Sequence, residues 1–147
     1  LRLYSRFASR SHRQRARLQA CIDEGERVLA RGTLTEDDIG AWSRVNEAFH
    51  RAIVEGTDSR VIADAIARNN HLPFASADSI LIDKSALDRE YQKLRFAQMQ
   101  HILVFDALEQ REAERVEMLM REHAWIGFRY GRLFGLETVA PVVRRAG

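Results

Sequence analysis

The sequence has one cysteine, two prolines and no long apolar run among its 147 residues. Because Cys21 is alone, no disulfide can form within the chain, and its place beside Leu18 and Ile22 predicts a small core residue. No stretch approaches the roughly 20 apolar residues of a membrane span, and the amino end shows no signal-peptide pattern. These absences predict a cytoplasmic protein with no membrane contact.

Acidic residues are absent from the first 17 positions, which carry six arginines. The net charge of the whole chain is only +2, so composition alone does not indicate a nucleic-acid binder. A solvated helix face is the simplest interpretation of these arginines, and a strip that docks a partner or contacts phosphate is the alternative. The chain starts at Leu1 and is already in helical rhythm, so we expect a fragment of a longer protein.

No strand pattern and no repeat is found, and apolar residues recur at steps of three and four nearly throughout. The expected fold class is therefore all-α. Helix boundaries are expected at Gly32 (a stop), Thr35 (an N-cap), Gly56 (a stop), Asp58 or Ser59 (a cap) and Ser85 (a cap), with a turn over 109–112. Residues 69–79 are expected to form the main loop, and the last helix to end near 134 or 135.

Short breaks between the expected helices predict antiparallel neighbours in one bundle. At this length we expect a single domain, residues 1–136, followed by a frayed tail, residues 137–147. The helix that follows Ser85 carries its predicted seam at positions 87, 91, 94, 98, 101, 105 and 108. Contact between neighbouring helices would bring their inward-facing polar side chains together.

Three of the five histidines, His50, His101 and His123, lie on the apolar stripes of three different expected helices. Asn46 lies one turn before His50 on the same face. One inward imidazole is usually a satisfied core residue, but three that face one interior could not all be protonated without strong repulsion. A divalent cation resolves this by taking neutral imidazoles as ligands. We therefore predict a metal site formed by these four residues.

Nitrogen donors with one oxygen suit zinc, nickel, iron or copper better than magnesium or calcium, and zinc or nickel is our first expectation. Only four protein ligands are evident, so positions can remain open for water or a small anion. The remaining histidines, His12 and His71, are expected to be surface or loop residues.

A helical metalloenzyme acting on a small acid is one alternative. Glu47 and His50 form the Glu-x-x-His unit that di-iron carboxylate bundles use twice, but Gln98 and Met120 stand at the matching positions before the later histidines. A Gly-rich phosphate loop and a nucleophile with a recognisable base are also absent, so we expect no catalysis. The other alternative is a purely structural dimerisation bundle with satisfied core histidines.

Residues 46–50 read Asn-Glu-Ala-Phe-His, which resembles the Asp/Asn-x-x-Phe-His signature of the FadR C-terminal (FCD) domain of GntR-family bacterial transcription regulators. Residues 100–108 resemble the Glu-His-x-x-Ile…Ala-Ile segment of that family, and residues 111–123 resemble its closing segment, which ends in Met-x-x-His. The likeness covers roughly residues 18–136.

This resemblance implies an antiparallel bundle of six or seven helices around a central cavity, in which many members hold a divalent metal through one Asp or Asn and three histidines. The matching positions are Asn46, His50, His101 and His123. Family effectors are typically small organic acids, whose carboxylate can complete the metal shell. The sequence departs from the family at Asn46, where many relatives have Asp, and at Gln100, which replaces the usual Glu.

Our leading hypothesis is a metal-dependent sensing and dimerisation domain for a small carboxylate effector in a GntR-family regulator, acting as a homodimer. DNA would be bound only through a winged helix-turn-helix head, which is not in the chain. Arg68, Arg95 and Tyr130 are candidate effector-lining residues, and Tyr130 shares the helix face of His123.

Overall fold

The computed structural model describes residues 2–56 and 82–124, with side chains described from residue 12 to residue 123 within those ranges. These residues form four helices: α1 (Arg2–Leu29), α2 (Glu36–Gly56), α4 (Leu87–Glu109) and α5 (Ala113–Ala124). The all-α class is confirmed for the described residues. The helix expected after Asp58 or Ser59, the main loop over 69–79, the end of the last helix and the 136/137 domain boundary lie outside them.

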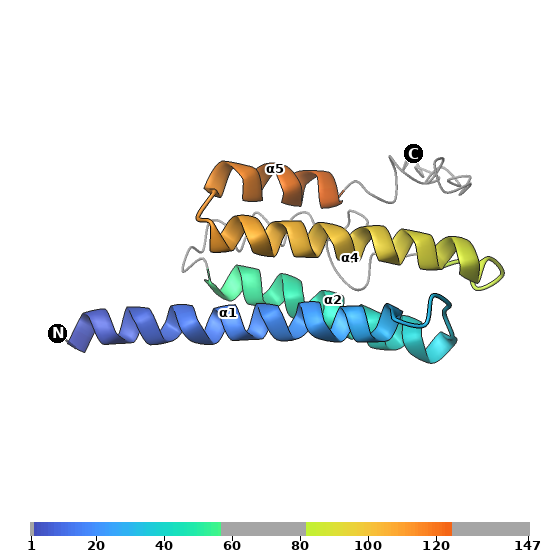
Figure 1. The fold of residues 1–147 in the computed structure, drawn as a ribbon, viewed down its shortest axis with the longest axis horizontal. Coiled ribbons are helices and arrows are strands. Elements are labelled where there is room, and N and C mark those ends of the chain that lie inside the picture. The colour runs from blue at the N-terminus through green and yellow to red at the C-terminus, as the bar shows by residue number, and fades with distance from the viewer. Residues whose placement is uncertain (1, 57–81, 125–147) are drawn as a thin grey trace, which may run out of the picture.

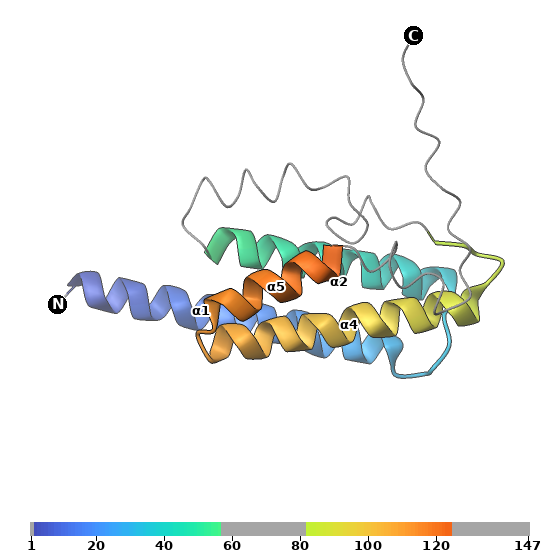
Figure 2. The same cartoon turned by 90° about the horizontal axis from the view of Figure 1, so that it is seen from above.

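The four helices lie side by side along one direction and alternate in sense where they are neighbours in sequence (Figure 1). α1 runs away from the amino end, α2 returns beside it, α4 runs parallel to α2, and α5 reverses again (Figures 1 and 2). α1 contacts both α2 and α4, and α5 packs on α4. The predicted antiparallel neighbours are confirmed for these elements, whereas the total of six or seven helices and the central cavity stay predictions.

Hydrogen bonds between neighbouring residues define the start of α2, where Thr35 is the predicted N-cap. The backbone N–H of Asp38 donates to the hydroxyl of Thr35 at 3.2 Å, and the Asp38 carboxylate accepts the Thr35 N–H at 2.8 Å. This reciprocal pair satisfies two of the backbone donors that a helix start leaves open. Gly32, at the turn between α1 and α2, has a φ of 75°, which glycine adopts without steric cost.

The start of α4 departs from the prediction. Ala86, rather than Ser85, occupies the N-cap position, and no side chain caps the helix. Both the backbone N–H and the hydroxyl of Ser85 donate to the Asp83 carboxylate, at 2.9 and 2.6 Å. The hydroxyl is thereby committed to a local turn and does not cap the helix.

The turn predicted over 109–112 is confirmed and closes α4 with a Schellman motif. The N–H of Glu112 donates to the carbonyl of Ala107 at 2.9 Å, and that of Arg111 donates to the carbonyl of Leu108 at 3.2 Å. Arg111 takes a φ of 60° at the position where glycine is usual. The tight reversal places α5 antiparallel against α4.

The buried face of α4 is wider than the predicted seam. Leu94, Gln98 and His101 of that seam are buried, but so is a second row of residues: Glu90, Lys93, Ala97, Gln100, Val104 and Ala107. Because α4 contacts α1 on one side and α5 on another, a single stripe cannot serve both neighbours. Cys21 is only half-buried and packs against the edge of an apolar cluster.

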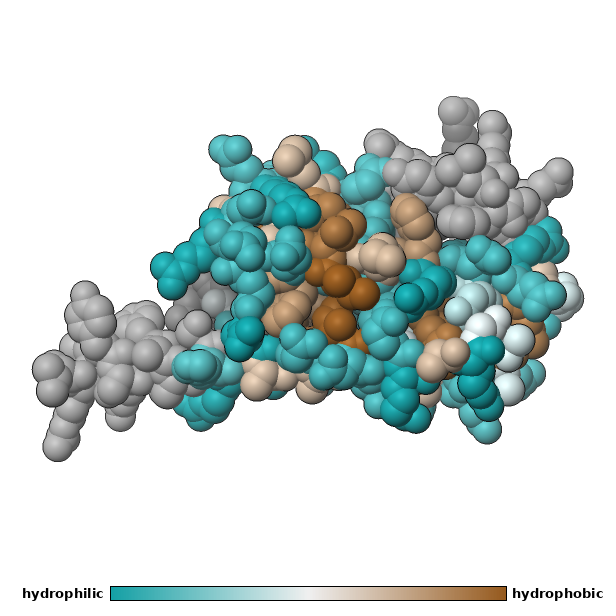
Figure 3. Space-filling model, viewed as in Figure 1, coloured by the Kyte–Doolittle hydropathy of each residue, from teal (hydrophilic) through white to brown (hydrophobic). Residues whose placement is uncertain are grey.

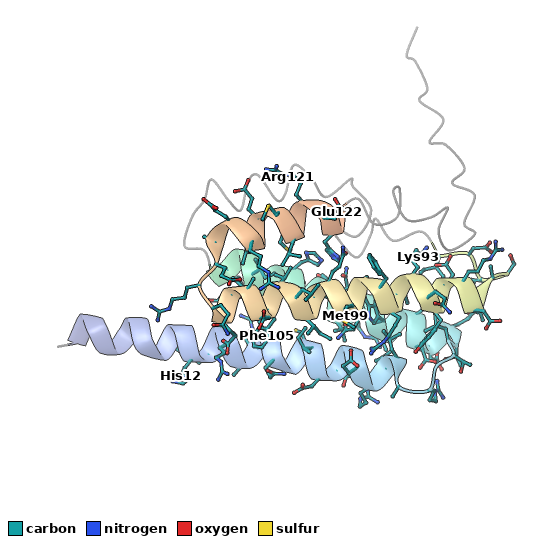
Figure 4. The ribbon with its side chains drawn as sticks, turned by 45° about the horizontal axis from the view of Figure 1, so that its top comes forward. His12, Lys93, Met99, Phe105, Arg121 and Glu122 are labelled. Atoms are coloured by element: carbon teal, nitrogen blue, oxygen red, sulfur yellow. The ribbon has the colours of Figure 1, made fainter. Side chains whose placement is uncertain are left out.

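The described arginines of the amino-terminal strip agree with a solvated helix face. Arg15 and Arg17 are exposed, and they pair with Glu109 of α4 and Glu55 of α2. Pairs at such exposure contribute little to stability. His12 is also exposed, as predicted, and lies on the outer side of α1 (Figure 4).

Gly25 of α1 lies directly against the side chain of Gln98 of α4. An ideal Cβ at this position would lie 2.3 Å from Oε1 of Gln98. The Gln98 amide is fully buried and donates to the Ile22 carbonyl at 3.0 Å, so it cannot retreat without losing that bond. Only glycine leaves room for the amide between the helices.

We expect Gly25→Ala to lower the free energy of unfolding by about 1–3 kcal/mol through this overlap, although alanine is the better helix former by about 1 kcal/mol. Gly40→Ala is the matched control, because its Cβ would meet only Arg44 Nη1 at 3.5 Å. Urea unfolding of both variants should show opposite signs. A stabilised Gly25→Ala variant would show that the helices do not approach this closely.

Candidate metal centre

Three imidazoles from three helices meet at one point in the bundle. Nε2 of His123 on α5 lies 3.1 Å from Nε2 of His101 on α4 and 3.2 Å from Nε2 of His50 on α2. The ligand atoms of the three residues all lie within 4.8 Å of one another. The helices therefore bring together the three histidines that the sequence pattern singled out.

Aromatic side chains hold the rings in place. His101 stacks between Trp42, with ring centroids 5.8 Å apart, and Phe49, with centroids 4.2 Å apart. Phe49 also meets His50 edge to face. On α5 the inner side carries His123, whereas Arg121 points away from the bundle (Figure 4). These contacts leave the imidazoles at most 6% exposed.

Burial keeps all three histidines neutral. It lowers the pKa of His50 from 6.5 to about 4. The pKa values of His101 and His123 lie well below 6.5, chiefly because burial penalises the charged ring and also because the neighbouring histidines repel a further charge. Near pH 7 each ring therefore carries a lone pair that can bind a cation.

Protons alone cannot satisfy this cluster. The carbonyl oxygen of Gln100 lies 2.9 Å from Nδ1 of His123, and an oxygen only accepts, so the ring proton of His123 sits on Nδ1. Its Nε2 then has one lone pair, which faces the Nε2 atoms of both His50 and His101. One lone pair cannot accept two well-aligned N–H bonds, so the two short contacts cannot both be good hydrogen bonds.

A single cation between the rings would use the lone pairs that the short contacts leave without hydrogen bonds. Metal–nitrogen bonds of about 2.0–2.1 Å place two nitrogens roughly 2.8–3.4 Å apart, over the range from octahedral to tetrahedral angles. The 3.1 and 3.2 Å separations at His123 lie within that range. The distances and the neutral donor set therefore fit a transition-metal ion.

Asn46 has a side-chain oxygen that makes no hydrogen bond to any of the described residues. Its side chain is fully buried, and neither Oδ1 nor Nδ2 has a hydrogen-bond partner there. A buried amide without partners costs about 1–3 kcal/mol. Since Asn46 lies one helical turn before His50 on α2, its Oδ1 is a suitable fourth donor toward the same point.

The other predicted site residues are placed differently. Arg95 pairs with Glu26 at 2.7 Å and lines a surface cavity of about 570 Å³ between α1 and α4, whose lining includes none of the three histidines. Arg68 and Tyr130 lie outside the described residues, as does His71. Contact of Arg95 with an effector stays a prediction, and it would require the pair with Glu26 to open.

Sequence reasoning missed the role of Gln100 beside the site. It was noted only as a departure from the family pattern, yet its amide is the hydrogen-bond partner of His123. The available signal was its position directly before a predicted ligand, on the part of the helix that faces α5. Glu47 is half-exposed and pairs with Arg51, so it points away from His50 and forms no Glu-x-x-His unit at the site.

The metal-free protein should lose stability as the pH falls below 6.5. Above that value the histidines are neutral in both the folded and the unfolded state. Below it the unfolded chain binds protons that the buried histidines of the folded chain do not bind, so a lower pH favours unfolding. For His50 the loss between pH 6.5 and about 4 amounts to about 3 kcal/mol. Urea unfolding from pH 7.5 to 4.5 measures it, with His12→Gln at an exposed position as control. Midpoints independent of pH would contradict buried neutral imidazoles.

None of the described helices combines the length and the apolar character that a bilayer span requires. The profile of the FCD domain family matches residues 3–124, and it confirms the predicted resemblance. No curated protein and no solved structure was found to match the chain. FCD domains are the effector-binding domains of GntR-family transcription regulators. The match covers most of the 147 residues, and the chain therefore belongs to the FCD domain family.

Proposed function

We propose that this chain is a metal-dependent sensor of small organic acids and the dimerisation domain of a GntR-family regulator. The observation that carries the proposal is the meeting of three buried, neutral Nε2 atoms from α2, α4 and α5. One turn before His50 on α2, the buried Asn46 amide has no hydrogen-bond partner within the part of the chain that the structure describes. Neutral nitrogen donors with one oxygen favour zinc or nickel over magnesium and calcium. When bound, such an ion supplies a Lewis-acidic centre to which a carboxylate can attach.

The charge of the donor set favours an anionic ligand. Asn46, His50, His101 and His123 are all neutral, so they leave both positive charges of a divalent ion uncompensated in a buried site. Charge in a low-dielectric interior is costly unless it is paired. A carboxylate in an open coordination position supplies the missing negative charge.

Ligand binding at this point would bias the packing of three helices. His50, His101 and His123 each belong to a different helix, so a ligand that tightens the shared centre favours one arrangement of α2, α4 and α5. Such a bias can be no larger than the difference in affinity between the two arrangements. DNA-binding heads attached outside the chain would respond to that change.

A second copy of the chain is the expected partner. Figure 3 shows apolar surface gathered in the middle of one face of the bundle. Met99 and Met118 are large apolar residues that are 45% and 62% exposed. Apolar surface of this kind supports association between copies.

The two alternative functions fit the geometry less well. A purely structural bundle would satisfy its buried histidines, yet the single Nε2 lone pair of His123 faces two other Nε2 atoms and cannot accept a well-aligned hydrogen bond from both. A metalloenzyme would need a base at the metal, and the cluster of potential ligands contains histidines alone among the described residues.

Metal analysis tests the site directly. We expect the purified chain to retain one zinc or nickel ion, and His50→Ala, His101→Ala and His123→Ala each to lose it, because a three-donor shell binds far more weakly. His12→Ala is the control at an exposed position. Small carboxylates should raise the melting temperature of the metal-loaded chain only, because a ligand that binds the folded state stabilises it. Unchanged metal content across the series would reject the site.

Asn46→Asp tests the charge argument separately. The carboxylate should bind zinc roughly tenfold more tightly or better, because it adds a negative charge to the shell. It should also weaken binding of a small carboxylate, since only one positive charge is left to neutralise. Competition with a chelator and calorimetric titration with the acid measure the two effects. If both affinities rise together, charge does not select the effector.

A further inference from the structure

Gln100 is a buried polar residue that contacts His123 on the side of its ring opposite the three Nε2 atoms. It is 6% exposed on α4, and its Oε1 lies 2.9 Å from Nδ1 of His123 on α5. Nδ1 and Nε2 lie on opposite edges of an imidazole, so this contact acts on the side of the ring away from the shared point. We propose that Gln100 is a positioning residue that holds His123 in the tautomer whose Nε2 lone pair faces the metal. The assignment rests on the proposed metal site.

The direction of this hydrogen bond follows from the amide atom that faces the ring, which is the oxygen of Gln100. If the amide nitrogen of Gln100 faced the ring, it would donate to Nδ1, and the proton of His123 would sit on Nε2. That proton would then point at His101 and His50, whose Nε2 atoms lie 3.1 and 3.2 Å away. It would also block the lone pair from any cation. The carbonyl oxygen as acceptor is the arrangement that frees Nε2.

The same helix provides a natural comparison in Gln98. This side chain is also fully buried, but its Nε2 donates to the carbonyl of Ile22 on α1 at 3.0 Å. Gln98 therefore ties α4 to α1, whereas Gln100 ties α4 to His123. A change at either position removes one buried amide, but only a change at Gln100 removes the acceptor of the ligand proton.

A carboxylate at position 100 would accept the Nδ1–H of His123 more strongly than the amide does. Gln100→Glu keeps an acceptor for Nδ1–H and adds a negative charge, which raises the basicity of His123 as a ligand. In the metal-free protein the same carboxylate is a buried charge without a cation, which destabilises the fold. Metal affinity and metal-free stability should therefore move in opposite directions. A merely structural role would move them together.

The test uses the full chain, stripped of metal and titrated with zinc against a chromophoric chelator. We expect Gln100→Leu to bind zinc about 10–100-fold more weakly. Gln98→Leu, with a comparable loss of melting temperature, should stay within about twofold of the unsubstituted chain. Gln100→Glu should bind zinc at least as tightly as the unsubstituted chain and melt at a lower temperature without metal. Nitrogen-15 spectra of the metal-free, unsubstituted chain should show the His123 proton on Nδ1.

Two results would overturn the assignment while leaving the metal site intact: zinc affinity unchanged in Gln100→Leu, or the His123 proton found on Nε2. Absence of zinc binding by the unsubstituted chain would overturn the proposed function instead. The tautomer spectrum then still decides the role of Gln100, because it needs no metal and no substituted protein.

Discussion

Three neutral imidazoles share one buried point, and their two short Nε2···Nε2 contacts cannot both be well-aligned hydrogen bonds. Each ring comes from a different helix, so the condition that satisfies the nitrogens also sets how α2, α4 and α5 lie relative to one another. Trp42 and Phe49 fix the ring of His101, and the Gln100 amide fixes that of His123. The apolar packing around the rings therefore directs their Nε2 atoms toward one point, but it provides no hydrogen-bond partners for them there.

Buried polar atoms that lack hydrogen bonds at this site destabilise the folded state. The unpartnered amide of Asn46 and the crowded Nε2 atoms each cost free energy that apolar contacts elsewhere must offset. In the proposed site a bound cation would replace this cost with ligand bonds, so metal binding would stabilise the helices in this packing. Sensitivity of the fold to a small ligand follows from the same condition, because the ligand acts where three helices meet.

Helical periodicity was sufficient to find the histidines, because a ligand on an inward face lies in register with the apolar residues around it. The Thr35 N-cap was equally readable, since its acceptor and donor lie three residues apart. Ser85 was misread because Asp83, two residues earlier, engages its hydroxyl. The surroundings of Arg95 depend on Glu26 of another helix, and no spacing within α4 encodes that pair. Residue spacing along the sequence predicts the helices and their ends. The contacts between helices become known only from the tertiary structure.

The site has neutral residues at two positions: Asn46, where many members of the family have Asp, and Gln100, where the usual residue is Glu. Asn46 removes a negative charge from the donor set, and Gln100 removes one from behind His123. In the proposed function the protein would provide geometry but little charge, and the effector would balance the charge of a bound divalent ion. Binding of metal and of a carboxylate are consequently linked, and by reciprocity each must raise the affinity of the other by the same factor. A more acidic shell would hold the ion more firmly and depend less on the acid, so neutrality at these positions favours response to the effector over retention of the metal.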